Sequence, residues 1–222
     1  MPYTLPKYRV STFFCPKSGG TSLRAYMFHL ENGFAFREYM SQGRKMDANT
    51  LSRNEGFKQV DHEFIKDFDK FALIRDPVKR FLSGYSNRVI HYQELSREVA
   101  GEKLAKFALS PDPSLEVFIE NFTKYCKASR SIGHHFTKQQ VWLGTDISYY
   151  KKIFHVENVG EMTDYFAQKL NMKAAMPQFQ SGGPKLEVGN LKAGLLDKIL
   201  KIVGDDIAFE ACKSYRSNYG LL

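Results

Sequence analysis

Short apolar runs alternate along this chain with longer segments whose apolar residues recur at helical spacing. Apolar runs of the kind that buried parallel strands show occupy residues 8–14, 70–75 and 151–156. Helical spacing marks residues 20–31, 77–92, 96–108, 114–126, 161–170 and 191–218. Strands that alternate with helices predict an α/β fold, in which helices flank both faces of a central, mainly parallel sheet.

Two polar stretches interrupt this alternation and are expected to be loops. They run from Ser41 to Gly56 and from Gln178 to Lys185, and both carry little apolar periodicity. The chain has 222 residues, of which 43% are hydrophobic, and neither a repeat nor a low-complexity run appears. This size suits one hydrophobic core, so we predict a single domain over residues 1–222.

The segment Cys15–Ser22 joins the first predicted strand to the first predicted helix. Its glycines let the backbone approach an anion, and the first N–H groups of the helix would point at that anion. Lys17 precedes both glycines, and no Gly-Lys-Ser or Gly-Lys-Thr occurs in the chain, so the segment differs from the Walker A loop of ATP- and GTP-binding proteins. The residues expected to bind a phosphate are Pro16, Lys17, Ser18, Gly19, Gly20, Thr21 and Ser22.

A second segment with anion-binding chemistry begins at Arg75, where the predicted strand 70–75 ends. The carboxyl ends of strands are where open α/β sheets bind their ligands, and a guanidinium group suits a terminal phosphate. Asp76-Pro77 is a strong helix start, and Ser83 lies two turns into that helix. Arg80 could line a binding cleft, but a structural role is favoured, because i,i+4 pairing with Asp76 is available.

Together these two segments resemble the 5′-phosphosulfate loop and the 3′-phosphate motif of sulfotransferases that use 3′-phosphoadenosine 5′-phosphosulfate (PAPS). The arrangement is most similar to the carbohydrate branch, which includes the chondroitin, dermatan and heparan 2-O enzymes. Weaker likenesses continue at residues 134–140, 152–159 and 196–215. The chain departs from the family pattern at Lys138-Gln139, where Pro-Gln is usual, and at Gly20, where many members carry a bulkier residue.

The resemblance implies a P-loop NTPase-like sulfotransferase fold and transfer of a sulfuryl group from PAPS to a hydroxyl group. It favours a carbohydrate as the acceptor, while a small phenol, a lipid-linked sugar and a peptide tyrosine stay open. The co-product would be adenosine 3′,5′-bisphosphate, and no metal is required. Lys17 would stabilise the leaving oxygen. The resemblance further implies that Arg75 and Ser83 bind the 3′-phosphate and that Lys185 contacts the nucleotide.

The acceptor hydroxyl must lose its proton, and histidine is a suitable base near neutral pH. His62 is the first candidate, because its segment resembles the one that supplies the base in the heparan 2-O enzymes. Glu63 is the second candidate, since other sulfotransferases use a carboxylate. His134 and His135 come third and could instead contact the acceptor. For each of these residues a purely structural role is the alternative.

The formal charge of +8 favours anionic partners, such as the nucleotide and an acidic glycan. Nucleic acid is not expected as a partner, because neither a basic stripe nor a binding motif is visible. The three cysteines are widely spaced and indicate neither a disulfide scaffold nor a zinc site. The sequence shows no signal peptide and no run that could span a membrane, so we expect a cytoplasmic enzyme.

Two other classes of protein stay open at this stage. One is a nucleotide or nucleoside kinase that binds ATP with Mg²⁺, against which the position of Lys17 argues. The other is a glycan- or polyanion-binding protein that keeps the fold without turnover. Substitution of Lys17 by Ala separates an enzyme from a binder, because an enzyme should lose turnover more than affinity.

Overall fold

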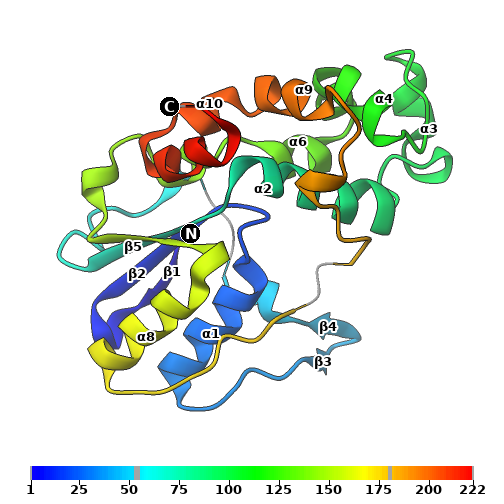
Figure 1. Ribbon diagram of the computed structural model, residues 1–222. Coiled ribbons are helices and arrows are strands. Elements are labelled where there is room, and N and C mark those ends of the chain that lie inside the picture. The colour runs from blue at the N-terminus through cyan, green and yellow to red at the C-terminus, as the bar shows by residue number, and fades with distance from the viewer. Residues whose placement is uncertain (1, 53–55, 180–181, 222) are drawn as a thin grey trace. The chain divides into compact units, whose positions relative to one another are not determined.

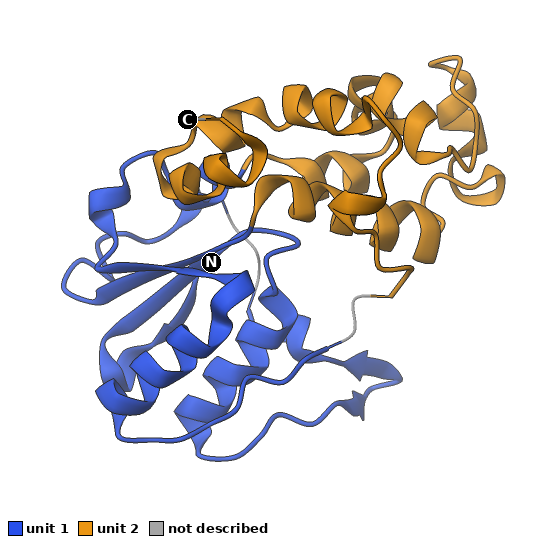
Figure 2. Ribbon diagram, in the orientation of Figure 1, with its two compact units in different colours: residues 1–75, 139–179 blue, residues 76–138, 180–222 orange. Residues whose placement is uncertain are grey.

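The structure is a computed structural model that describes residues 2–52, 56–179 and 182–221. The chain divides into two compact units (Figure 2). Unit 1 comprises residues 1–75 and 139–179, and unit 2 comprises residues 76–138 and 180–222. The prediction of one domain over residues 1–222 stays a prediction, and each unit is described by itself.

Unit 1 contains a four-stranded sheet in the order β1-β2-β5-β6 (Figure 1). The strands are β1 (Tyr3–Leu5), β2 (Val10–Phe14), β5 (Asp69–Ile74) and β6 (Lys152–His155). β5 pairs in parallel with both β2 and β6, whereas β1 runs antiparallel to β2 at the edge. The predicted α/β fold with a central, mainly parallel sheet is therefore confirmed. The three-residue strand β1 was not predicted.

Helices and aromatic residues cover both faces of this sheet. α1 (Gly20–Asn32) and α8 (Val159–Leu170) lie on one face, where Tyr26 contacts Phe166 with 6.4 Å between ring centroids. α7 (Gln139–Leu143) packs against β2, and Phe13 meets the ring of Tyr150 at 5.4 Å. The short 3₁₀ helices of unit 1 are η1 (Pro6–Tyr8), η2 (Ala48–Thr50), η3 (Phe57–Gln59), η5 (Ile147–Tyr149) and η6 (Val156–Asn158).

A hairpin occupies part of the first predicted loop. β3 (Tyr39–Ser41) pairs antiparallel with β4 (Arg44–Met46), and Gln42 and Gly43 between them have φ values of 48° and 72°. Two residues with positive φ form the tight turn that suits a two-residue hairpin. The prediction of a loop from Ser41 onwards was wrong here, because strands of three exposed residues leave no apolar alternation to detect. Residues 53–55 of the stretch lie outside the described residues.

Unit 2 is built from helices around its own core, which includes Phe81, Phe118 and Ile199. Its α-helices are α2 (Pro77–Gly84), α3 (Arg97–Ala105), α4 (Leu115–Glu120), α5 (Phe122–Ala128), α6 (Arg130–Phe136), α9 (Leu195–Ile202) and α10 (Gly204–Ala208). α2 continues as the π-helix η4 (Tyr85–His91), and the 3₁₀ helices are η7 (Val188–Asn190) and η8 (Glu210–Tyr219).

The predicted helix 114–126 is interrupted at Asn121, whose φ of −112° and ψ of 20° end α4 before α5 begins. The predicted helix 191–218 is likewise divided into α9, α10 and η8. Both breaks were missed because apolar residues keep their spacing across them. α6 and α7 were also missed, since helices of five to seven residues carry too few turns for a periodic signal.

The second predicted loop has no regular structure in its described residues, 178–179 and 182–185. Gly183 has a φ of 90° and lies so close to Ser86 that an added Cβ would be 2.3 Å from the Ser86 carbonyl oxygen. The hydroxyl of Ser86 also donates to the carbonyl oxygen of Pro184 at 2.5 Å. A backbone that approaches this closely requires glycine. Gln180 and Ser181 lie outside the described residues.

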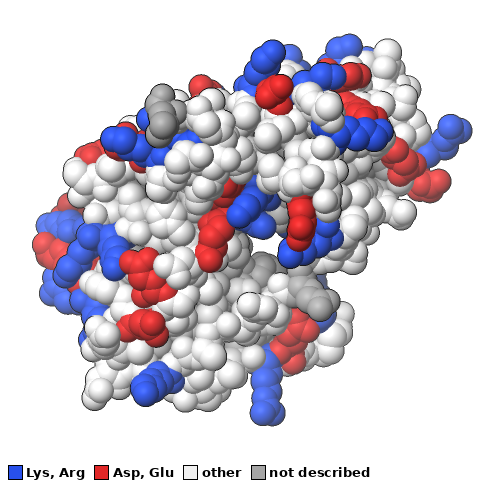
Figure 3. Space-filling model, in the orientation of Figure 1, with Lys and Arg blue, Asp and Glu red and all other residues white. Residues whose placement is uncertain are grey.

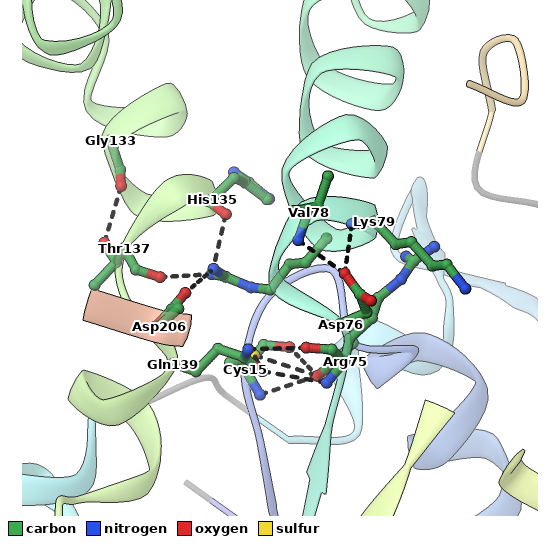
Figure 4. A network of polar contacts seen from close by, with 12 residues as sticks. Cys15, Arg75, Asp76, Val78, Lys79, Gly133, His135, Thr137, Gln139 and Asp206 are labelled. Atoms are coloured by element: carbon green, nitrogen blue, oxygen red, sulfur yellow. Dashed lines mark hydrogen bonds and ion pairs between the residues drawn. The ribbon is translucent and has the colours of Figure 1, made fainter. Parts of the chain in front are cut away.

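Asp76 starts α2 as predicted, because its Oδ1 accepts hydrogen bonds from the N–H groups of Val78 and Lys79 at 2.9 and 3.1 Å (Figure 4). The hydroxyl of Tyr219 donates to the same carboxylate at 2.7 Å. The expected pairing of Arg80 with Asp76 stays a prediction, whereas the structural role expected for Arg80 is supported by other contacts. The guanidinium of Arg80 pairs with the buried carboxylate of Asp206 at 3.1 Å.

Within the part of the chain that the structure describes, helices are too short or too polar to cross a membrane.

Candidate active site

The segment Cys15–Gly19 forms a tight loop between β2 and α1, all within unit 1. Lys17 and Gly19 both adopt left-handed conformations, with φ values of 68° and 76°. A lysine rarely adopts this conformation, and such backbone strain concentrates at functional sites. The N–H group of Leu23 is the first of α1 to bond within the helix, to the Gly19 carbonyl at 2.9 Å. The preceding N–H groups of α1 are thus oriented for an anion, at the positive end of a 13-residue helix.

The hydroxyl groups of the loop do not all face the same way. Ser18 is fully buried, and its hydroxyl donates to the Cys15 carbonyl at 2.7 Å, so this side chain stabilises the loop itself. The hydroxyl of Thr21 donates to Oδ1 of Asn49 at 2.9 Å. Ser22 accepts the N–H of Phe179 at 3.3 Å, and its own proton bonds no other residue that the structure describes. Of the predicted hydroxyl donors, Ser22 is therefore the best disposed to bind an anion.

Gly20 allows Phe14 and Arg24 to pack directly beneath the loop. A Cβ at Gly20 would lie 2.8 Å from the ring of Phe14 and 3.2 Å from a guanidinium nitrogen of Arg24. The guanidinium of Arg24 is 4.6 Å from the centroid of the Phe14 ring and donates to the Ser52 hydroxyl at 3.0 Å. Burial lowers the pKa of Arg24 to about 10, so it remains a cation near neutral pH. No pattern in the sequence indicated that this cation supports the loop.

Arg75 lies at the carboxyl end of β5, and its side chain reaches the loop. One guanidinium nitrogen, Nη1, donates to the carbonyl oxygen of Lys17 at 2.9 Å. The backbone of Arg75 is held by the fully buried side chain of Gln139 (Figure 4): the Arg75 N–H donates to Oε1 at 3.2 Å, and Nε2 donates to the Arg75 carbonyl at 2.9 Å. The structure thus brings together the two residues, Lys17 and Arg75, that sequence motifs far apart in the chain singled out.

The other predicted site residues outside the loop divide between the two units. Ser83 is half-buried in α2 of unit 2. Lys185, also in unit 2, is 88% exposed and forms an ion pair with Glu187 at 2.9 Å. Both assignments to the nucleotide site stay predictions.

The two histidines of α6 lie in unit 2 with their rings 5.2 Å apart. Nδ1 of His135 is 2.8 Å from the Ser131 carbonyl oxygen, which only accepts, so Nδ1 carries a proton. Burial, together with the positive charges of Arg88 and Arg130, lowers the pKa of His134. The neutral form of His134 therefore predominates near neutral pH, which suits a base. The role of His134 as the third candidate for the general base stays a prediction.

His62 lies in unit 1 within a cluster of aromatic rings. Its Nε2 is 2.7 Å from the Phe57 carbonyl oxygen and its Nδ1 is 2.7 Å from the Tyr149 hydroxyl. A carbonyl oxygen only accepts, so Nε2 carries the proton and Nδ1 of the neutral ring accepts from Tyr149. Both ring nitrogens are thus engaged, which favours the structural alternative. Glu63 is exposed and pairs with Lys66 one turn further on.

Replacement of His62 by Ala is expected to lower the free energy of unfolding by about 1–3 kcal/mol, because Phe57 and Tyr149 would each lose a hydrogen-bond partner. Urea unfolding checks this expectation. The same variant decides the catalytic role, since loss of a general base would also lower kcat of the folded enzyme by about 10²–10⁴. An unchanged kcat with reduced stability would exclude His62 as the base.

A cavity of about 390 Å³ lies beside β1 and the end of α1, and Tyr3, Glu31 and Phe64 are among its lining residues. None of the predicted site residues lines it. Among the described residues, no group of three or more His, Cys, Asp or Glu side chains is arranged to hold a metal ion. On the face drawn in Figure 3, basic and acidic side chains are interspersed over each unit.

A comparison with family models places this arrangement in a known class. Residues 3–189 match the model of the sulfotransferase family, and this range includes both the Lys17 loop and Arg75. The match covers most of the chain, so the protein belongs to the sulfotransferase family, whose members transfer sulfuryl groups. The resemblance seen in the sequence is thereby confirmed. Neither the curated proteins nor the solved structures gave a significant match to the chain.

Proposed function

We propose that this sulfotransferase uses PAPS as donor and a carbohydrate hydroxyl group as acceptor. The observation that carries the choice of donor is the hydrogen bond between the Arg75 guanidinium and the Lys17 carbonyl. It brings the guanidinium of Arg75 to the backbone of Lys17, so two cationic residues from separate motifs meet at the carboxyl end of the parallel sheet. A donor with two separate phosphate groups, such as PAPS, offers one anion to each.

The residues that are present fit such a donor. The phosphosulfate would be held by the loop, through the N–H groups at the start of α1 and the hydroxyl of Ser22. Arg75 would bind the 3′-phosphate, because a guanidinium group offers a planar, permanently charged fork of donors that suits a phosphate. Ser83 and Lys185 would add contacts to the nucleotide, as the family resemblance implies.

In the proposed reaction the acceptor oxygen attacks sulfur in line and a new S–O bond forms. The bond between sulfur and the bridging oxygen breaks, and its electron pair remains on adenosine 3′,5′-bisphosphate. Lys17 stabilises the charge that develops on that oxygen. The proton of the acceptor hydroxyl passes to a general base, for which His62 and Glu63 are the proposed candidates.

The carbohydrate acceptor is proposed from the resemblance to the carbohydrate branch. The net charge of +8 supports an acidic glycan among the possible acceptors, because opposite charge raises the rate of encounter. A screen of neutral and acidic oligosaccharides with PAPS, read out as formation of adenosine 3′,5′-bisphosphate, tests this part of the proposal. Turnover with small phenols in place of sugars would contradict it.

The donor is tested by calorimetric titration with adenosine 3′,5′-bisphosphate, 5′-AMP and ATP. We expect the bisphosphate to bind with a dissociation constant on the order of micromolar without metal, and 5′-AMP at least about tenfold more weakly. Arg75→Ala should abolish that difference, because it removes the group that binds the 3′-phosphate. Arg9→Ala, which changes an exposed arginine of unit 1, is the matched control and should retain it.

Two results would overturn the proposed donor. One is equal affinity for the bisphosphate and 5′-AMP in the unchanged protein. The other is binding of ATP alone, and only with Mg²⁺, which would favour a kinase activity instead.

A further inference from the structure

Gln139 lies at the point where the chain returns to unit 1. Residues 76–138 belong to unit 2, so Arg75 is the last residue before this segment and Gln139 is the first residue after it. The Gln139 side chain is fully buried, at the start of α7. Its amide bonds both polar groups of the Arg75 backbone, and the thiol of Cys15 donates to the same Oε1 at 3.4 Å.

These contacts hold the backbone of the residue that directly follows β5. β5 ends at Ile74, which is the last residue of that strand paired with β6. Arg75 is the next residue, so its N–H and C=O groups lie directly beyond the end of this strand. A primary amide presents an acceptor and a donor side by side, and Gln139 uses both on a single residue.

The position of the Arg75 side chain depends on this backbone. The guanidinium reaches the Lys17 carbonyl at 2.9 Å, and Cys15 on the other side of the loop bonds Gln139 directly. Gln139 thus connects the ends of β2 and β5, the two strands that carry the phosphate loop and Arg75. A shift of about 1 Å in a binding group is enough to lose most of its interaction.

We propose that Gln139 is a positioning residue that sets Arg75 for the 3′-phosphate of the donor and so determines the selectivity for nucleotides that carry this phosphate. The proposal rests on the proposed function. Gln139 itself does not touch the nucleotide: it acts through the Arg75 backbone. Loss of the Gln139 amide should therefore weaken the binding of nucleotides that carry a 3′-phosphate and leave the binding of those without one unchanged.

The test compares the affinities of adenosine 3′,5′-bisphosphate and 5′-AMP in Gln139→Met, which keeps the length of the side chain and removes its amide. We expect the preference for the bisphosphate to fall about tenfold, with the affinity for 5′-AMP within about twofold of the unchanged protein. Gln140→Met is the matched control, because Gln140 is the next residue, is only partly buried and is expected to leave the preference unchanged. Circular dichroism verifies that each variant is folded.

Gln139→Glu provides a second variant with the same shape. A buried carboxyl group has a raised pKa, and its protonated form can accept from the Arg75 N–H and donate to the Arg75 carbonyl as the amide does. Once ionised it can no longer donate. Relative to the unchanged protein at each pH, its preference for the bisphosphate should be near normal in mildly acidic solution and fall as the pH rises.

The outcomes separate this proposal from the proposed function. A preference in the unchanged protein that survives in both Gln139 variants at all pH values overturns the role of Gln139 and leaves the donor intact. An equal loss of affinity for both nucleotides also overturns the role of Gln139, since it indicates general damage to the site. No preference in the unchanged protein overturns the proposed donor, and the role of Gln139 with it.

Discussion

Lys17→Ala is expected to lower kcat for sulfuryl transfer by about 10²–10³, with only a several-fold loss of affinity for adenosine 3′,5′-bisphosphate. The physical reason is that a cation near the bridging oxygen stabilises the transition state, in which negative charge develops on that oxygen, more than it stabilises the bound donor. The bound donor in its ground state is also held by the N–H groups of α1 and by Arg75, which the variant keeps. Steady-state kinetics and calorimetry on the same preparation measure both quantities.

Lys58→Ala is the matched control for this variant, because Lys58 is an exposed cation of unit 1 outside the loop. Its kcat should equal that of the unchanged protein. The loop should also remain intact in Lys17→Ala, since Arg75 bonds the backbone carbonyl of residue 17 and not its side chain. A loss of affinity as large as the loss of kcat would contradict the role of Lys17 in the transition state and favour a binding protein.

Asp206→Ala is expected to lower the free energy of unfolding by about 3–5 kcal/mol. The carboxylate of Asp206 and the guanidinium of Arg80 are only 4% and 5% exposed, and their atoms lie 3.1 Å apart. Removal of one partner leaves a buried charge without compensation. The Thr137 carbonyl accepts from the same guanidinium at 2.5 Å, and a neutral acceptor cannot replace a carboxylate. Urea or thermal unfolding measures the effect.

The neighbouring residue supplies the control for this prediction. Asp205 pairs with Lys138, but their side chains are 60% and 51% exposed. Asp205→Ala should therefore lower the free energy of unfolding by less than about 1 kcal/mol. Equal effects of the two substitutions would show that the buried pair contributes no more than a surface pair. The matched family range ends at residue 189, so Asp206 lies beyond it and yet stabilises α2.

The elements that the sequence predicted well are those with local causes. β2, β5, α1 and the start of α2 depend on apolar runs, helical spacing and the Asp76-Pro77 cap, all of which act over a few residues. The candidate phosphate loop has the same character, since its glycines and lysine are adjacent in the chain. Short elements such as the β3–β4 hairpin and α7 escaped prediction, because they contain too few residues for a period to show.

The candidate site also contains residues whose importance only the tertiary structure decided. In the sequence Gln139 stood out only as part of a family likeness, with no sign of its partners, and its contacts with Arg75 and Cys15 join positions 64 and 124 residues apart. For Arg80 the sequence offered only the local partner Asp76, and folding brings it the buried carboxylate of Asp206, from 126 residues away.

The sequence by itself therefore determined the class of fold, the family and the two motifs that would bind the donor. Tertiary structure decided which of the candidate side chains are engaged within the fold, as it did for Ser18, whose hydroxyl is used within the loop, and for His62, whose ring nitrogens both have partners. The physical reason is that local patterns act through neighbours along the chain. Burial and hydrogen-bond partners, in contrast, are set by residues that only folding brings together.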